Sequence, residues 1–469
     1  MKETHRAQKS DAATETLGQQ LRNSPQINSL LDSLVEQAMS YSQRIQGIKG
    51  PDTALEAQAK KDIDSLGAVR SRPLYYNYLG SGVGRGCYVE LADGSVKLDL
   101  INGIGIHLLG HSHPRVIRAA LAGALSDVVQ QGNLQPNQEY REFSEKLLKL
   151  ASKNSRLKYC WLATCGSMAN ENALKMARQK KTGTRMIMTF KNAFAGRTTM
   201  MTEITDNAAF KVGIPDYKEI LRLPFYDAKG PKDATLNAMK EHVSKHENNI
   251  CCFVFEPMLG EGGYRAANHE FYVPLLEFCK SKGIPVWADE IQTFTRTGNF
   301  FAYETLGIGE YVDLCTIAKT AQDGATFFAE DFKPDAGLLG GTFSGSSAAM
   351  RAGLEILTIM EQDGYMGAGG KVLQIHNDFV SMLNDLNETT CKGLLREAGG
   401  MGLMVAVTTL DGSKEKQGLL LKTLFKNGLI CFGCGSDPYR IRFLIPAIIS
   451  AQEIAVAKKV IEKSILELA

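Results

Sequence analysis

The spacing of apolar positions changes its period along the chain, and the first clear signal is helical. Residues up to about Pro25 are polar and show no period. Apolar residues then recur at helical spacing, at Ile27, Leu30, Leu31, Leu34, Val35 and Ala38. This pattern predicts a frayed tail followed by an amphipathic helix.

Short alternating runs among glycines follow between Leu74 and Leu100. Within them Ala92, Asp93 and Gly94 are typical of a hairpin turn. This region predicts a small antiparallel unit.

Five near-continuous apolar runs mark the middle of the chain: KYCWLAT, MIMTF, ICCFVFE, IPVWADE and LCTIAK. Longer segments with helical period, such as FYVPLLEFCKSKG, separate them. Apolar runs that are linked by helices and buried on both faces predict a parallel α/β sheet. After about Gly345, a helical stretch, strands around RIRFLIP and a final helix from Ala451 to Leu468 predict an α+β C-terminal domain.

Length and charge narrow the function classes. A chain of 469 residues has room for a large domain and a smaller one. Lys and Arg number 53 against 51 for Asp and Glu, which leaves no basic footprint for nucleic acid or an anionic membrane. We therefore expect small-molecule partners.

The cysteines and the N-terminal residues indicate in which cellular compartment the protein is expected. The ten dispersed cysteines indicate free thiols in a reducing compartment. The N-terminal residues lack an apolar stretch, and no uncharged apolar run reaches the roughly 18 residues of a membrane helix. A cytoplasmic protein is expected.

Polar residues at the ends of buried strands are the candidates for chemistry, because ligands of open α/β sheets gather at carboxyl ends. IPVWA ends in Asp289, and LCTIA ends in Lys319. A salt bridge between these two residues, closing the sheet, is one explanation.

Two further strand ends carry candidates. KYCWLAT precedes Cys165, Gly166 and Ser167, and small residues that open a helix suit a phosphate, although an ordinary N-cap by Ser167 is the alternative. MIMTF precedes Phe194 and Arg197, which taken alone also suit a core aromatic and a surface cation.

The ordered blocks CGSMANENALKMAR, FKNAFAGRT, FVFEPMLGEGG, WADEIQTFTRTG, TIAKT and GGTFSG carry a family resemblance. Together they resemble the class III (ω-amino group) aminotransferases of the acetylornithine/4-aminobutyrate type, roughly from Leu74 to the C-terminus. The resemblance implies pyridoxal 5′-phosphate (PLP) as cofactor and PLP fold type I. That fold has a large α/β domain with a mainly parallel sheet flanked by helices, and a smaller α+β domain from the N- and C-terminal segments.

We expect four segments: a polar tail and N-terminal helical segment (1–73), the N-terminal part of the small domain (74–130), the large PLP-binding domain (131–345) and the C-terminal small domain (346–469).

By this resemblance Lys319 holds PLP as a Schiff base and moves the substrate proton, as a desolvated amine can. Asp289 faces the pyridine nitrogen and keeps it protonated. Gln292 bonds the ring hydroxyl, and Ile291 and Phe194 pack on opposite ring faces.

The resemblance also assigns the phosphate and the subunit arrangement. Gly166 and Ser167 bind the phosphate, and Thr342 of the neighbouring subunit completes that site. The active unit is therefore expected to be a homodimer with a shared active site.

For the substrate, Arg197 matches the arginine that binds the α-carboxylate of glutamate or 2-oxoglutarate, a bidentate role that suits a guanidinium. Arg442 and Glu261 match a pair that closes while an ω-amine donor binds and opens for the second carboxylate of glutamate. A plain buried ion pair is the alternative.

Some residues depart from the family pattern. Thr320, Ala321, Gln322 and Asp323 stand before Gly324 where relatives often have a glycine-rich run, so this loop is expected to differ in shape. Ile104 matches a position that is Tyr in ornithine aminotransferases, which makes ornithine a less suitable donor. Met168 replaces the second cysteine that holds an iron–sulfur cluster in some relatives, and no cluster is expected.

Three other signals favour structural roles. The run Gly80, Gly82, Gly84, Gly86 has no helix after it and indicates a flexible turn. His111 and His113 have no third ligand nearby, and Cys431 and Cys434 have no second pair at zinc spacing, so no metal is predicted.

The sequence therefore predicts transfer of an ω-amino group from a donor of N-acetylornithine or 4-aminobutyrate type to 2-oxoglutarate, giving glutamate and a semialdehyde. Another PLP reaction, such as decarboxylation or an aminomutase step, and a non-catalytic PLP-binding protein are the alternatives.

Overall fold

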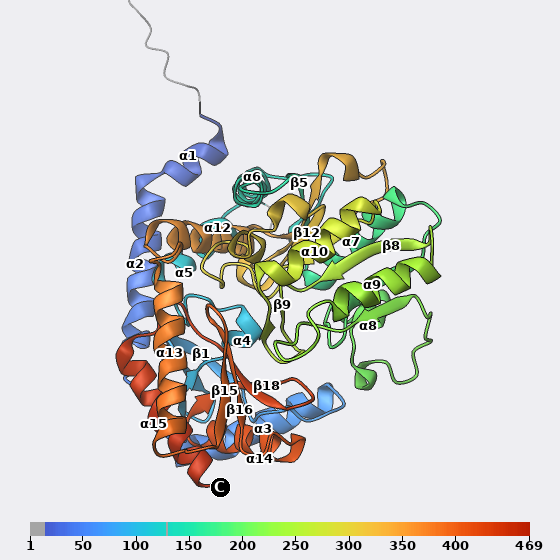
Figure 1. Ribbon diagram of the computed structural model, residues 1–469. Helices are drawn as coiled ribbons and strands as arrows, with labels where there is room; N and C mark the ends of the chain where they lie inside the picture. The colour runs from blue at the N-terminus through green and yellow to red at the C-terminus, as the bar shows by residue number, and fades with distance from the viewer. Residues whose placement is uncertain (1–14, 128–129) are drawn as a thin grey trace, which may run out of the picture.

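A seven-stranded sheet forms the centre of the larger part of the molecule (Figure 1). The computed structural model describes residues 15–127 and 130–469. The strand order is β5-β13-β12-β11-β8-β6-β7. The strands are β5 (Leu157–Ala163), β6 (Met186–Phe190), β7 (Ile220–Leu223), β8 (Ile250–Phe255), β11 (Val286–Asp289), β12 (Leu314–Ile317) and β13 (Gly324–Ala329).

The sheet confirms the mainly parallel arrangement expected from the sequence. The five apolar runs form β5, β6, β8, β11 and β12. Neighbouring strands from β7 to β12 pair in parallel, whereas β13 lies antiparallel between β12 and β5. The strands β7 and β13 were not predicted.

Both faces of this sheet are buried, which explains the continuous apolar runs. Along β8, Phe253 and Phe255 pack into one core, and Cys252 and Val254 pack into another on the opposite face. The first core includes α6 (Gln138–Ala151), α10 (His269–Ser281) and α12 (Ser347–Gln362), whereas α7 (Gly166–Lys180) packs into the second. Shorter or peripheral helices are α8 (Thr199–Ile204), α9 (Ala234–Lys245) and α11 (Ala302–Thr305).

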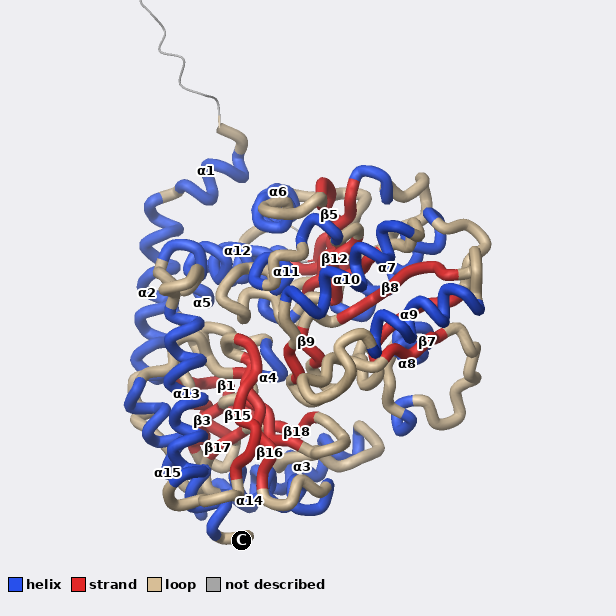
Figure 2. Tube along the Cα trace, in the orientation of Figure 1, coloured by secondary structure: helices blue, strands red, loops and turns tan. Residues whose placement is uncertain are grey.

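The smaller part combines both ends of the chain (Figure 2). One sheet has the order β1-β2-β3-β17, from β1 (Gly80–Arg85), β2 (Tyr88–Leu91), β3 (Val96–Asp99) and β17 (Leu429–Ile430). A second has the order β15-β16-β19-β18, from β15 (Leu395–Met401), β16 (Met404–Thr409), β18 (Phe432–Cys434) and β19 (Arg440–Leu444). The helices are α13 (Lys371–Glu388), α14 (Lys414–Lys426) and α15 (Ala451–Leu466).

The expected α+β unit from N- and C-terminal segments is therefore present, with β3 and β17 paired in parallel. The predicted hairpin turn also forms, since β2 and β3 are antiparallel and Gly94 has φ +72°.

The remaining elements lie outside these three sheets and their covering helices. They are α1 (Leu17–Asn23), α2 (Pro25–Ser42), α3 (Thr53–Val69), α4 (Asn102–Gly105), α5 (Pro114–Ala124) and the two-residue strands β4 (Gln130–Gln131), β9 (Met258–Leu259), β10 (Arg265–Ala266) and β14 (Gly345–Ser346). Four short 3-10 helices are η1 (Ala208–Phe210), η2 (Gly309–Tyr311), η3 (Lys319–Ala321) and η4 (Glu330–Phe332). Within the described ranges, no helix has the length and apolar character needed to cross a bilayer.

The frayed tail up to Pro25 was predicted wrongly in its described part. Leu17–Asn23 is the helix α1, because Thr16 and Gln19 form a capping box that satisfies the first free N–H groups. Residues 1–14 lie outside the described residues.

The glycine run was also interpreted wrongly, since Gly80–Arg85 is the strand β1 rather than a flexible turn. A Cβ on Gly84 would lie 2.4 Å from the Cβ of His111, so glycine allows this close approach. The ring of His111 bonds Asp99 through Nε2 at 2.9 Å, and Cys431 and Cys434 are buried free thiols.

Candidate active site

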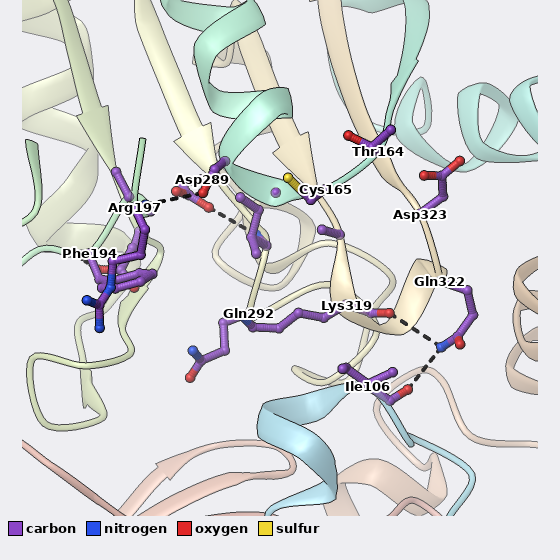
Figure 3. A pocket seen from close by; sticks show the side chains of 17 residues that line it. Ile106, Thr164, Cys165, Phe194, Arg197, Asp289, Gln292, Lys319, Gln322 and Asp323 are labelled. Carbon is purple, nitrogen blue, oxygen red and sulfur yellow. Dashed lines mark hydrogen bonds between the residues drawn. The ribbon is translucent and has the colours of Figure 1, made fainter. Parts of the chain in front are cut away.

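A cavity of about 350 Å³ lies at the carboxyl ends of β11 and β12 (Figure 3). The structure places eight of the sequence-predicted site residues in its lining: Gly166, Ser167, Phe194, Arg197, Asp289, Ile291, Gln292 and Lys319. They come from loops after four different strands, so the fold and not the sequence spacing brings them together.

Lys319 follows β12 and begins η3, with its backbone in the left-handed region at φ +55°. Burial lowers the pKa of its amine, and the charge of Arg296 lowers it further, opposed by Asp289. Within the described ranges the structure shows no hydrogen bond or ion pair at Nζ. This amine loses its proton more readily than an exposed lysine and is therefore a better nucleophile.

Asp289 ends β11 and is nearly fully buried. Its Oδ2 accepts a hydrogen bond from Asn170 Nδ2 at 2.7 Å, and its Oδ1 accepts one from the N–H of Ile291 at 3.1 Å. Burial raises the pKa of Asp289 to about 6, although both hydrogen bonds oppose that shift. Asp289 makes no ion pair with Lys319 across the sheet, so the salt-bridge explanation of these two residues is wrong.

The N-terminus of α7 opens into the same cavity. Cys165 is the N-cap and makes no side-chain cap bond, so the ordinary N-cap by Ser167 is wrong. Instead Ser167 Oγ accepts a hydrogen bond from the N–H of Arg197 at 3.3 Å. The first bond within this turn runs from the N–H of Ala169 to Cys165. The N–H groups before it remain available for an anion.

Two glycines are required by the close packing around this turn. A Cβ on Gly166 would lie 2.9 Å from Ile291 Cδ1, and a Cβ on Gly196 would lie 2.3 Å from Ser167 Oγ. Gly196 also has φ +133°. A larger residue at either position would therefore displace Ile291 or Ser167, two residues of the cavity lining.

Unused polar groups point to a ligand. Gln292 Oε1 and Asn170 Oδ1 are buried and have no hydrogen-bond partner. Glu256 also lines the cavity, and it accepts hydrogen bonds from the N–H groups of Phe194 and Gly260, both at 3.0 Å. Burial raises the pKa of Glu256 to about 8, and the nearby charge of Asp289 adds to this shift.

Arg442 and Glu261 form an ion pair of 2.6 Å between Nη2 and Oε1. The Arg442 side chain is fully buried, its Nε and Nη1 have no partner, and its guanidinium lies 5.6 Å from the ring centres of Tyr264 and Phe432. Glu261 is 33% exposed. Neither residue is in the cavity lining, but both charges act on the pKa of Lys319, which Arg442 lowers and Glu261 raises.

Arg197 is exposed at the cavity and its guanidinium lies 3.3 Å from the ring centre of Phe210. Figure 3 shows its side chain directed away from Lys319.

Two predicted residues lie elsewhere. Ile104 belongs to α4, is 37% exposed and does not line the cavity, whereas its neighbour Ile106 does. Thr342 is exposed and also outside the lining formed by its own chain; its carbonyl would lie 2.5 Å from a Cβ on Gly132.

Sequence reasoning gave no site role to five residues: Asn170, Glu256, Arg296, Ile106 and Gln322. The first three lie inside sequence blocks already recognised, and a buried charge or amide there was the available signal. Ile106 gives no such signal, because its place depends on the backbone path after β3.

The sequence profile of the family described as Aminotransferase class-III matches residues 75–465. The chain is a class III aminotransferase. Such enzymes are PLP-dependent transferases, so pyridoxal phosphate is the cofactor of this aminotransferase. The cavity fits that group, since it offers an unpaired amine, a buried carboxylate, a buried amide oxygen without a partner and an open helix N-terminus.

Curated relatives carry related names. This aminotransferase is 32% identical over 391 residues to a "Probable 4-aminobutyrate aminotransferase" of Bacillus subtilis, covering 78% of this chain and 88% of the relative. It is 31% identical over 390 residues to an "Acetylornithine aminotransferase" of Bacillus anthracis, covering 81% and 93%.

The fold is similar to solved structures. A lysine aminotransferase from M. tuberculosis superposes with a TM-score of 0.77 at 20% identity, covering 87% of this chain and 100% of that one. A Bacillus anthracis aminotransferase gives a TM-score of 0.77 at 21% identity, covering 87% and 99%.

Proposed function

We propose that this aminotransferase moves the ω-amino group of an amino-acid donor of N-acetylornithine or 4-aminobutyrate type to 2-oxoglutarate, giving glutamate and a semialdehyde. The observation that carries the proposal is the ion pair between Glu261 and buried Arg442, whose charges both act on the pKa of Lys319, together with Arg197 in the cavity lining. The names of the two curated relatives agree with this class of donor.

Four residues would hold the cofactor ring. Asp289, firmly oriented by Asn170, would face the pyridine nitrogen as an anion. Gln292 Oε1 would accept the hydrogen bond of the ring hydroxyl, and Ile291 and Phe194 would pack on the ring faces. When bound, PLP supplies an electron sink that stabilises negative charge on the reacting carbon.

Lys319 would bind the cofactor through Nζ and would move the substrate proton once its amine is free. Its lowered pKa favours the neutral amine that both roles need.

The phosphate would lie on Gly166 and Ser167 at the start of α7. Thr342 does not reach the cavity of its own chain, and its exposure is consistent with service to a neighbouring subunit. We therefore propose a homodimer with shared active sites. The free thiols fit a cytoplasmic location.

The charged groups would let one site accept two unlike substrates. Arg197 would bind the α-carboxylate of glutamate or 2-oxoglutarate by a bidentate contact. While an ω-amine donor is bound, Glu261 would neutralise Arg442 through Nη2. When Glu261 swings out, Nη2 would be freed and would join the unpaired Nη1 and Nε in binding the second carboxylate. Glu261 is 33% exposed and Arg442 is fully buried, so Glu261 would be the partner that moves.

The test is a pair of half-reactions with the holoenzyme. A panel of 4-aminobutyrate, N-acetylornithine, ornithine and lysine is added without any keto acid, and the visible absorption of the bound cofactor and the aldehyde product are followed. At least one ω-amino donor should give one equivalent of semialdehyde per site, and 2-oxoglutarate should then restore the spectrum and yield glutamate. Release of carbon dioxide, or no product with any donor, would contradict the proposal.

A further inference from the structure

The segment after β3 adopts a left-handed turn beside the active site. In α4 the φ angles of Asn102, Gly103 and Ile104 are +50°, +61° and +60°, and Gly105 follows at +89°. This conformation is unfavourable for L residues, and most of all for a β-branched side chain such as Ile104. Contacts from the surrounding structure must therefore hold the turn.

The start of the turn is fixed within the smaller part of the molecule. Asp99 Oδ1 accepts hydrogen bonds from the N–H groups of Ile101 and Asn102, both at 2.9 Å. The side chain of Asn102 donates to the carbonyl of Leu444 at 2.7 Å. These bonds anchor one end only.

The other end is held by the loop that carries Lys319. Thr320 Oγ1 donates to the carbonyl of Gly105 at 3.3 Å, and Arg296 donates to the same carbonyl. Gln322 Nε2 donates to the carbonyl of Ile106 at 3.0 Å, as Figure 3 shows. This loop is the part of the sequence that departs from the family pattern, and the structure connects it to the turn.

Gln322 itself has an unfavourable backbone. Its φ is +63°, a conformation that glycine adopts without strain and glutamine does not. The side chain also donates to the carbonyls of Lys319 at 3.4 Å and Thr320 at 3.3 Å. Glycine would relieve the strain but could make none of these contacts, so the side chain is what distinguishes glutamine here.

Ile106 connects this contact to the ligand. It lines the cavity together with Lys319 and Gln322, and Figure 3 shows Gln322 bonded to the backbone carbonyls of both Ile106 and Lys319. We propose that Gln322 is a positioning residue that holds Ile106 as a wall of the active-site cavity and thereby sets the affinity for the aliphatic chain of the amino donor. The identity of the ligand as an amino donor rests on the proposed function.

The test compares Gln322→Gly and Gln322→Met with the unchanged holoenzyme. Glycine keeps the left-handed backbone and removes the whole side chain that bonds the carbonyl of Ile106. Methionine keeps a side chain of similar volume and removes only the N–H group that donates this hydrogen bond. Asn248→Gly is the control, since Asn248 is an exposed left-handed residue with φ +59° outside the cavity. Hydrogen exchange over 102–107 is measured by mass spectrometry, alongside PLP affinity and steady-state kinetics.

Loss of one hydrogen bond should raise exchange over 102–107 and the donor KM about 3- to 10-fold in both Gln322 variants. In Gln322→Gly, kcat and PLP affinity should stay within about twofold, because the turn holding Lys319 is retained. Asn248→Gly should change neither exchange nor KM.

Unchanged exchange over 102–107 in both Gln322 variants would show that the hydrogen bond from Gln322 does not hold this segment. Raised exchange with an unchanged donor KM would overturn the role of the Ile106 wall. If the unchanged enzyme processes no ω-amino donor, the proposed function is wrong. The exchange result would still decide whether Gln322 holds the segment 102–107.

Discussion

Replacing Asn170 by Ala should raise the pH at which the apoprotein loses affinity for PLP. Asn170 is fully buried, and its Nδ2 donates to Asp289 Oδ2 at 2.7 Å and to the carbonyl of Ala195 at 2.7 Å. The hydrogen bond favours the ionised form of Asp289 and opposes the effect of burial, which raises the pKa of Asp289 to about 6. Removing Asn170 takes away one of the hydrogen bonds that lower the pKa of Asp289, so burial should raise this pKa further.

The size of the effect follows from that bond. A hydrogen bond to a charged group contributes about 1.5–3 kcal/mol, which corresponds to about one to two pKa units. The pKa of Asp289 should therefore rise from about 6 to between about 7 and 8. At pH 7 the ionised fraction falls from about nine-tenths to between about a tenth and a half. An acid with a raised pKa stays protonated to higher pH, so PLP affinity is lost earlier as pH falls.

The assay is a titration of apoprotein with PLP between pH 5.5 and 8.5, followed by fluorescence. The ionisation of PLP itself contributes equally to both proteins and cancels in their difference. Asn172→Ala is the matched control, because Asn172 is a buried asparagine of the same helix with no hydrogen bond to Asp289 in the structure. If the acid limb of Asn170→Ala coincides with that of the unchanged protein, the argument for Asp289 is refuted.

Three further variants test other parts of the site. Gly166→Ala places a Cβ 2.9 Å from Ile291 Cδ1 and should weaken PLP binding about tenfold or more, measured on the apoprotein; unchanged affinity would contradict the tight packing. Glu261→Gln removes the counter-charge of buried Arg442 and should lower kcat/KM for the ω-amino donor about tenfold, with the KM for 2-oxoglutarate within twofold. Equal losses for both substrates would rule out the switch. Arg197→Lys loses the planar fork and should raise the KM for 2-oxoglutarate about tenfold, whereas an unchanged KM would remove Arg197 from carboxylate binding.

The central sheet could be predicted because most of its strands are continuous apolar runs that are visible in the sequence itself. Runs such as ICCFVF are apolar at every position, and both faces of β8 are indeed buried. The strand β13 was missed, although all of its residues are buried, since only residues 320–323 separate it from Lys319. It returns antiparallel to β12, and its other edge pairs with β5, far away in the sequence.

The residues of the candidate site also fall into two groups, those visible in the local sequence and those that depend on contacts between distant segments. Lys319 and Asp289 were singled out because a charged group at the end of an apolar run is conspicuous. Ile106 and Gln322 were not assigned a role, because their contact joins two segments about two hundred residues apart and runs through a backbone carbonyl. Side chains that act through backbone contacts leave no composition signal.

The central claim is that Lys319 carries the cofactor, and peptide mapping tests it most directly. Holoenzyme is reduced with borohydride, digested with trypsin and analysed by mass spectrometry, with Lys319→Ala treated in parallel. A phosphopyridoxyl group should appear on the peptide that spans Lys319 and should be absent from the variant. A label on a different lysine of the unchanged protein, or an unmodified Lys319 in protein that retains PLP, would contradict the account.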